Sequence, residues 1–111
     1  MTCSLFKANA KHTTQPTVAV TDEEFDLVVN LNMRSIYLSA SVIVPYMQKR
    51  GQGGVFVQIA STAAIRPRPR LTWYNASKAA ASCATKTMAL EYAADKIRFN
   101  SVCPVLGSTG M

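Results

Sequence analysis

The pattern of apolar and polar positions predicts a long helix in the first half of the chain. Apolar side chains recur at helical spacing over residues 21–50, and Thr21 and Glu24 match a capping box at the start. Pro45 is expected to kink this helix or to begin a second segment. Gly51 follows two basic residues and is expected to end it.

The second half of the chain reads as a strand, a helix and another strand. Residues 55–60 form a short apolar run, which is typical of a buried strand. The alanine-rich residues 71–95 predict a helix, and residues 97–103 predict a strand that Pro104 ends. This order forms a crossover connection, so the strands are expected to be parallel neighbours in an α/β sheet.

Candidate chemistry gathers where these two strands end. Ser61 directly follows the first strand, and residues 104–109 follow the second. Tyr74 stands near the start of the helix between them. Ligands of open parallel sheets bind outside the carboxyl ends of the strands. We therefore expect Ser61, Tyr74 and Lys78 to face one cleft at that edge.

Tyr74 and Lys78 are four residues apart, so they lie on the same face of a helix. A nearby ammonium favours the ionised phenol and is expected to lower its pKa from the usual value of about 10. Such a phenol donates and accepts protons closer to neutral pH. Loss of the ammonium, as in Lys78→Met, is expected to raise that pKa again.

The order and spacing of four residues resemble the catalytic tetrad of the short-chain dehydrogenase/reductase family: Asn32, Ser61, Tyr74 and Lys78. Further segments resemble the family and extend the match over residues 21–111: Phe25-Asp26, Asn32–Leu38, Gly54–Ser61 and Ile97–Pro104. The resemblance implies an α/β fold with part of a doubly wound, Rossmann-type parallel sheet. It also implies an NAD- or NADP-dependent oxidoreductase that interconverts an alcohol and a carbonyl.

The resemblance also implies a role for each residue of the tetrad. Tyr74 is the general acid in reduction, and Lys78 assists it and bonds the nicotinamide ribose hydroxyls. Ser61 stabilises charge on the substrate oxygen. Asn32 holds a water that links Lys78 to solvent.

The cofactor contacts that the resemblance implies come from Tyr74, Lys78, Pro104, Gly107 and Thr109. Val105 stands where the family's segment after this proline carries a glycine.

The family's glycine-rich nucleotide-binding turn has no counterpart in this sequence. The glycines stand at positions 51, 53, 54, 107 and 110, and no G-x-G-x-x-G occurs. We interpret residues 1–20 as a divergent N-terminal segment and residues 21–111 as the catalytic portion of the domain. The chain is thus expected to be truncated, and inactive when alone.

The net charge of +6 is unevenly distributed, because residues 27–90 hold eight basic residues and no acid. The basic residues are scattered over two helices and a loop, so we do not expect a nucleic-acid partner. The one cluster is Arg66-Pro67-Arg68-Pro69-Arg70, an extended loop. It is interpreted either as a solvated loop or as a rim of charge beside the substrate.

Three cysteines without metal-ligand spacing favour a reduced, cytoplasmic setting. His12 is the only histidine, so we expect neither a zinc site nor a Ser-His-Asp triad. Residues 1–20 hold no apolar stretch of membrane-spanning length, and no membrane partner is expected.

An alternative function is that of a non-catalytic fragment that keeps only a helix-helix association surface. In the family, the two long helices form the main subunit interface, so a homo-oligomer is expected. Without the nucleotide-binding half, the isolated chain is expected to self-associate and to bind dinucleotide weakly or not at all. The substrate and the choice between NAD and NADP are not readable from these residues.

Overall fold

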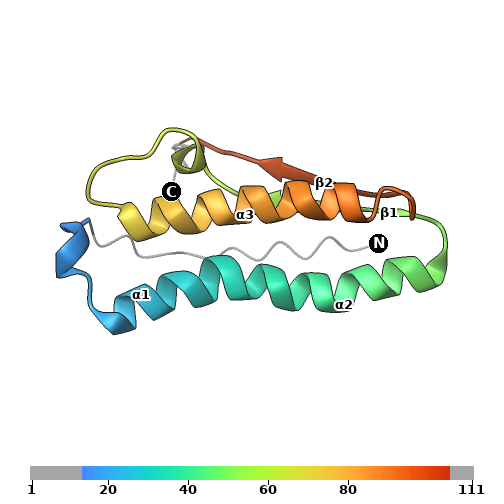
Figure 1. Cartoon of the computed structure of the whole chain (residues 1–111), viewed down its shortest axis with the longest axis horizontal. Coiled ribbons are helices and arrows are strands. Elements are labelled where there is room, and N and C mark those ends of the chain that lie inside the picture. Colours follow the sequence, from blue (N-terminus) through green and yellow to red (C-terminus); the bar gives the residue numbers. More distant parts are fainter. Residues whose placement is uncertain (1–13, 106–111) are drawn as a thin grey trace, which may run out of the picture.

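The computed structural model describes residues 14–105. After a 3-10 turn at Thr17–Ala19, one helical rod comprises α1 (Asp22–Val29), a π-helical segment (Asn30–Arg34) and α2 (Ser35–Arg50). Then follow β1 (Gly54–Ile59), a 3-10 helix (Thr62–Ala64), α3 (Thr72–Glu91) and β2 (Ile97–Val102). The rod and α3 run side by side along the length of the molecule (Figure 1).

The two ends of the rod form as the sequence predicts. The Thr21 side chain accepts a hydrogen bond from the Glu24 N–H, and the Glu24 carboxylate accepts one from the Thr21 N–H, which completes the capping box. At the other end, Gly51 adopts a left-handed conformation with φ of 65°, which glycine reaches without a steric penalty.

The two strands are parallel, as predicted, and Phe56 pairs with Phe99. The α/β class is therefore confirmed, and the parallel pair matches part of a Rossmann-type sheet. Gly53 lies where the two strands begin, with φ of +69°. A Cβ there would stand 2.6 Å from the Lys96 carbonyl oxygen, so only glycine allows this approach.

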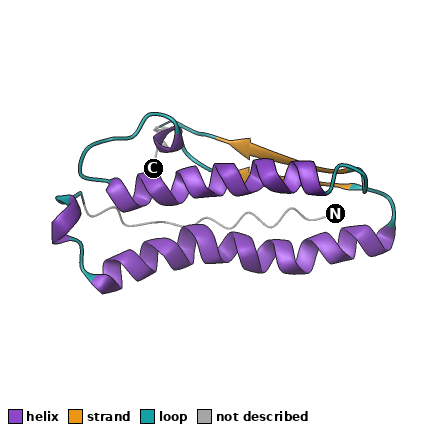
Figure 2. Ribbon diagram, in the orientation of Figure 1, coloured by secondary structure: helices purple, strands orange, loops and turns teal. Residues whose placement is uncertain are grey.

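Both long helices pack on the same face of the sheet. The core contains Val44 and Met47 of α2 together with Ile97 and Phe99 of β2. From α3, Met88, Ala89 and Tyr92 pack against this cluster. In Figure 2, α3 passes in front of part of the strands, and the rod runs alongside α3.

The opposite face of the sheet is open in the part of the chain that the structure describes. Alternate residues of β1 are exposed: Val55, Val57 and Ile59. Parallel sheets are usually covered on both faces, so these side chains are placed for contact with further protein. Within residues 14–105, this apolar face of the sheet is therefore uncovered.

Three boundaries differ from the sequence-based expectations. Pro45 lies inside α2, so it begins no second helical segment, and the kink expected there stays a prediction. The rod instead changes geometry earlier, at the π-helical segment Asn30–Arg34, which no local signal predicted. Helix α3 ends at Glu91 rather than near residue 95, because the chain turns there to enter β2, with Lys96 at φ of 57°.

The rod also has the length and mean hydropathy of a membrane-spanning helix. Length and composition are weak evidence for a membrane span, because helices of soluble proteins and signal sequences share them. In the structure, the rod packs along α3 and contributes Val44 and Met47 to the core. Its exposed apolar residues include Tyr37, Leu38 and Val42.

Candidate active site

Ser61 lies at the carboxyl end of β1, where the 3-10 helix begins. Its Oγ accepts a hydrogen bond from the Ala63 N–H at 3.1 Å, so Ser61 caps that helix. The next N–H, of Thr62, donates to the Pro104 carbonyl oxygen at 3.3 Å. The segments that follow β1 and β2 therefore meet at one edge of the sheet.

Tyr74 and Lys78 occupy the first turns of α3 at the same edge. The Lys78 Nζ lies 5.8 Å from the centre of the Tyr74 ring, as four-residue spacing on a helix predicts. The same Nζ donates to the carbonyl oxygen of Ile59 at 3.1 Å. Ile59 is the last residue of β1, so this bond fixes the start of α3 near Ser61.

Asn32 is buried within the π-helical segment, although an isolated helical asparagine is more often exposed. Its Nδ2 donates to the Ser77 Oγ at 3.0 Å, and the Ser77 Oγ donates to the Tyr74 carbonyl oxygen at 2.7 Å. Asn32 is thus joined through Ser77 to the helical turn that carries Tyr74 and Lys78.

Sequence reasoning missed two buried polar residues of α3, Ser77 and Asn75. Ser77 is only 3% exposed. Asn75 is also buried, and its Nδ2 donates to the Arg68 carbonyl oxygen at 2.8 Å. The Asn75 Oδ1 is buried without a hydrogen-bond partner among the described residues. The available signal was the presence of polar side chains in an alanine-rich helix, beside Tyr74 and Lys78.

Contacts join Asn32 through Ser77 to the turn of Tyr74 and Lys78, and Lys78 in turn contacts Ile59, two residues before Ser61. The catalytic roles of the four tetrad residues stay predictions. Of the expected cofactor contacts, Pro104 lies beside Thr62, whereas Gly107 and Thr109 fall outside the described residues.

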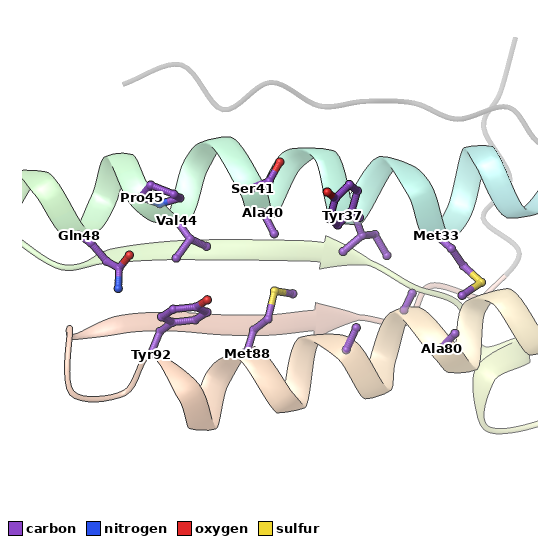
Figure 3. Close-up of a pocket in the computed structure, with 13 residues that line it drawn as sticks. Met33, Tyr37, Ala40, Ser41, Val44, Pro45, Gln48, Ala80, Met88 and Tyr92 are labelled. Atoms are coloured by element: carbon purple, nitrogen blue, oxygen red, sulfur yellow. The ribbon is translucent and has the colours of Figure 1, made fainter.

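A cavity of about 360 Å³ lies elsewhere, between α2 and α3 (Figure 3). Its walls are mainly apolar and include Met33, Tyr37, Met88 and Tyr92. None of the tetrad residues lines it. The cavity therefore belongs to the contact between the helices rather than to the chemistry at the sheet edge.

Burial lowers the pKa of the Lys78 ammonium from the ordinary lysine value of 10.5, because desolvation disfavours the charged form. Below the folded-state pKa, the cost of burying the charged ammonium therefore lowers the free energy of unfolding. This destabilisation disappears as the pH rises toward 10.5, where the ammonium loses its proton in both the folded and the unfolded chain. We expect NMR titration of the Lys78 side chain to give a pKa below 10.5, and the associated gain in stability to be absent from Lys78→Met. A Lys78 pKa at or above that value contradicts the expectation.

Together, the two parallel strands and the polar residues at their carboxyl edge define an α/β protein, a class in which ligands bind at that edge of the sheet. The family model described as short chain dehydrogenase matches residues 4–111. The chain belongs to the short-chain dehydrogenase/reductase family.

Individual relatives agree with this assignment. The chain is 45% identical to 4-formylbenzenesulfonate dehydrogenase of Comamonas testosteroni, over 94% of this chain and 41% of that protein. It is 37% identical to a 3-oxoacyl-[acyl-carrier-protein] reductase of Thermotoga maritima, over 85% and 38% of the two chains.

Among solved structures, the 3-ketoacyl-(acyl-carrier-protein) reductase of Brucella melitensis, complexed with NADH, superposes with a TM-score of 0.84 and 41% identity. The match covers 87% of this chain and 41% of that one. The chain thus spans about two fifths of the length of these relatives.

Proposed function

We propose that this chain is the catalytic portion of an NAD(P)-dependent oxidoreductase that interconverts an alcohol and a carbonyl. The observation that carries the proposal is the bond from the Lys78 Nζ to the Ile59 carbonyl oxygen. It holds the helix with Tyr74 and Lys78 against the strand end that leads into Ser61. Membership of the family supports the same reaction class.

In the proposed reaction, a substrate carbonyl lies between Ser61 and Tyr74. The Ser61 hydroxyl donates a hydrogen bond to the substrate oxygen and stabilises the negative charge that develops there. The Tyr74 hydroxyl transfers its proton to that oxygen, and in the reverse direction it accepts the proton from the alcohol. Lys78 keeps a positive charge beside the Tyr74 ring.

The chain's residues fit the nicotinamide side of an NAD or NADP cofactor. The partly buried Lys78 ammonium uses one donor on Ile59 and has two further N–H groups that suit ribose hydroxyls. When bound, the cofactor supplies or accepts hydride at carbon. Pro104 lies at the same edge and would border the nicotinamide. A reduced cytoplasmic setting stays a prediction, and Cys83 and Cys103 are free thiols.

Oxidation of NADH or NADPH by the natural gene product, in the presence of a panel of aldehydes and ketones, tests the proposal. Ser61→Ala is expected to lower kcat by about 10²–10³-fold, the loss typical of one donor to a developing oxyanion. Ser101→Ala is the control, because Ser101 is exposed on β2. Equal activity of the two variants would mean that Ser61 takes no part in the reaction.

A second candidate function is subunit association without catalysis. It is favoured by the exposed apolar side chains of α2, with Tyr37 69% and Val42 70% exposed, and by the apolar cavity beside α3. Surfaces of this kind are typical of contacts between proteins. A gene product that forms homo-oligomers but oxidises no NAD(P)H with any carbonyl of the panel would favour this function over the first.

A further inference from the structure

The loop that joins the 3-10 helix to α3 carries the densest positive charge of the described chain. Arg66, Arg68 and Arg70 stand at alternate positions there, and no acidic residue occurs from residue 27 to residue 90. The loop leaves the segment after Ser61 and enters the helix that carries Tyr74. It therefore lies at the carboxyl edge of the sheet (Figure 1).

The backbone of this loop is held at three points. The Arg66 N–H donates to the Thr62 carbonyl oxygen at 2.7 Å, and the Arg70 carbonyl oxygen accepts from the Gln15 N–H at 3.1 Å. Between Arg66 and Arg70, the Asn75 Nδ2 donates a hydrogen bond to the Arg68 carbonyl oxygen at 2.8 Å. Pro67 and Pro69 restrict the intervening backbone further. A loop fixed in this way loses little conformational entropy when it binds a ligand.

Two of the three guanidinium groups remain available. The Arg70 Nη2 donates to the Thr14 carbonyl oxygen at 3.4 Å, which directs this side chain toward the N-terminal segment. Arg66 and Arg68 are exposed, and their side chains form no hydrogen bond or ion pair with any residue in the range 14–105. The carboxylate of Glu24 accepts hydrogen bonds from Gln15 and Thr21 instead.

The loop contacts the first turn of α3, which carries Tyr74. The Asn75 side chain contacts the Arg68 backbone directly, and Asn75 is the residue after Tyr74. The Arg68 backbone is therefore fixed beside the helical turn that carries Tyr74. A guanidinium presents N–H groups in a planar fork, which matches the oxygens of carboxylate, sulfonate and phosphate groups.

We propose that Arg66 and Arg68 bind an anionic substituent of the substrate, at the far end from the reacting carbonyl. The proposal rests on the proposed oxidoreductase function, and it names the substrate class: small carbonyl compounds or alcohols that carry a carboxylate, sulfonate or phosphate group. Such a contact orients the substrate and selects it against neutral analogues.

The test compares benzaldehyde with 4-formylbenzoate and 4-formylphenyl phosphate, using the natural gene product. The ratio of kcat/KM for a charged aldehyde to that for benzaldehyde is measured for the double variant Arg66→Gln/Arg68→Gln. We expect this ratio to fall by about tenfold or more, the loss typical of one or two charge-assisted hydrogen bonds. A larger fall for the phosphate or for the carboxylate identifies the preferred anion.

The control double variant is Arg50→Gln/Arg98→Gln, which removes the same charge. Arg50 ends α2 and Arg98 lies near the start of β2, so both lie away from the carboxyl edge. An equal fall in both double variants would show a general charge effect and overturn the proposal. An unchanged ratio in Arg66→Gln/Arg68→Gln would overturn it as well.

Binding of 4-formylbenzoate, measured by saturation-transfer NMR without turnover, separates this inference from the proposed reaction. Binding that is lost in Arg66→Gln/Arg68→Gln supports the anion site even if no aldehyde is reduced. Absence of binding to the unmodified protein counts against the site even if benzaldehyde is reduced. If an oligonucleotide binds in preference to 4-formylbenzoate through the same two arginines, the arginines contact nucleic acid and the proposed substrate site is overturned.

Discussion

Tyr74→Phe is expected to lower kcat for carbonyl reduction by about 10²–10⁴-fold, because the substitution removes the proposed proton donor and leaves the aromatic ring. The Lys78 bond to Ile59 does not involve the phenol hydroxyl, so the helix start is expected to keep its position. The measurement is steady-state oxidation of NADH or NADPH by the natural gene product with its best carbonyl substrate.

Tyr46→Phe is the matched control for this experiment. Tyr46 lies on α2 and is 61% exposed, and it contacts Arg50 rather than any residue of the candidate site. The control is expected to keep full activity. If Tyr74→Phe retains the same activity as Tyr46→Phe, another group donates the proton and the assignment of Tyr74 is wrong.

Ile97→Ala is expected to lower the free energy of unfolding by about 2–5 kcal/mol, the range for removing a large side chain from a core. Ile97 is only 2% exposed and lies in the cluster that joins α2 to β2. The substitution leaves a cavity between β2 and the side chains of Val44 and Met47. Because natural domains are stable by only about 5–15 kcal/mol, this single change removes a large share of the total.

Chemical denaturation followed by circular dichroism measures this loss. Ile65→Ala removes the same atoms from a residue that is 70% exposed, and we expect it to cost less than about 0.5 kcal/mol. Similar losses for both variants would mean that the cluster around Ile97 is not the core of the folded chain.

The element order of this fold was predictable because each signal acts locally. The capping box at Thr21 and the left-handed Gly51 depend only on neighbouring backbone groups, and both formed as the sequence predicted. The parallel pairing followed from the strand-helix-strand order. Tyr74 and Lys78 were brought together by helical spacing alone.

The features that sequence reasoning missed depend on contacts between distant segments. The bond between Asn32 and Ser77 joins residues separated by 45 positions, and neither residue signals its partner. The π-helical geometry around Asn32 also has no local sequence signature. The bond from Asn75 to Arg68 joins residues only seven positions apart, but it forms only once the loop has turned back onto α3.

The π-helical segment has a geometric consequence for the whole rod. In an α-helix each residue advances the side-chain direction by about 100°, and a π turn accommodates one more residue than an α turn. The side chains after Arg34 therefore point in a different direction around the helix axis from the direction they would have in a continuous α-helix. Phe25, before the segment, packs edge-on against Trp73 of α3, and Val44, after it, lines a cavity together with Met88 of α3. Apolar side chains on both sides of the π-helical segment thus face α3, and Asn32 lies within the segment that sets their relative phase.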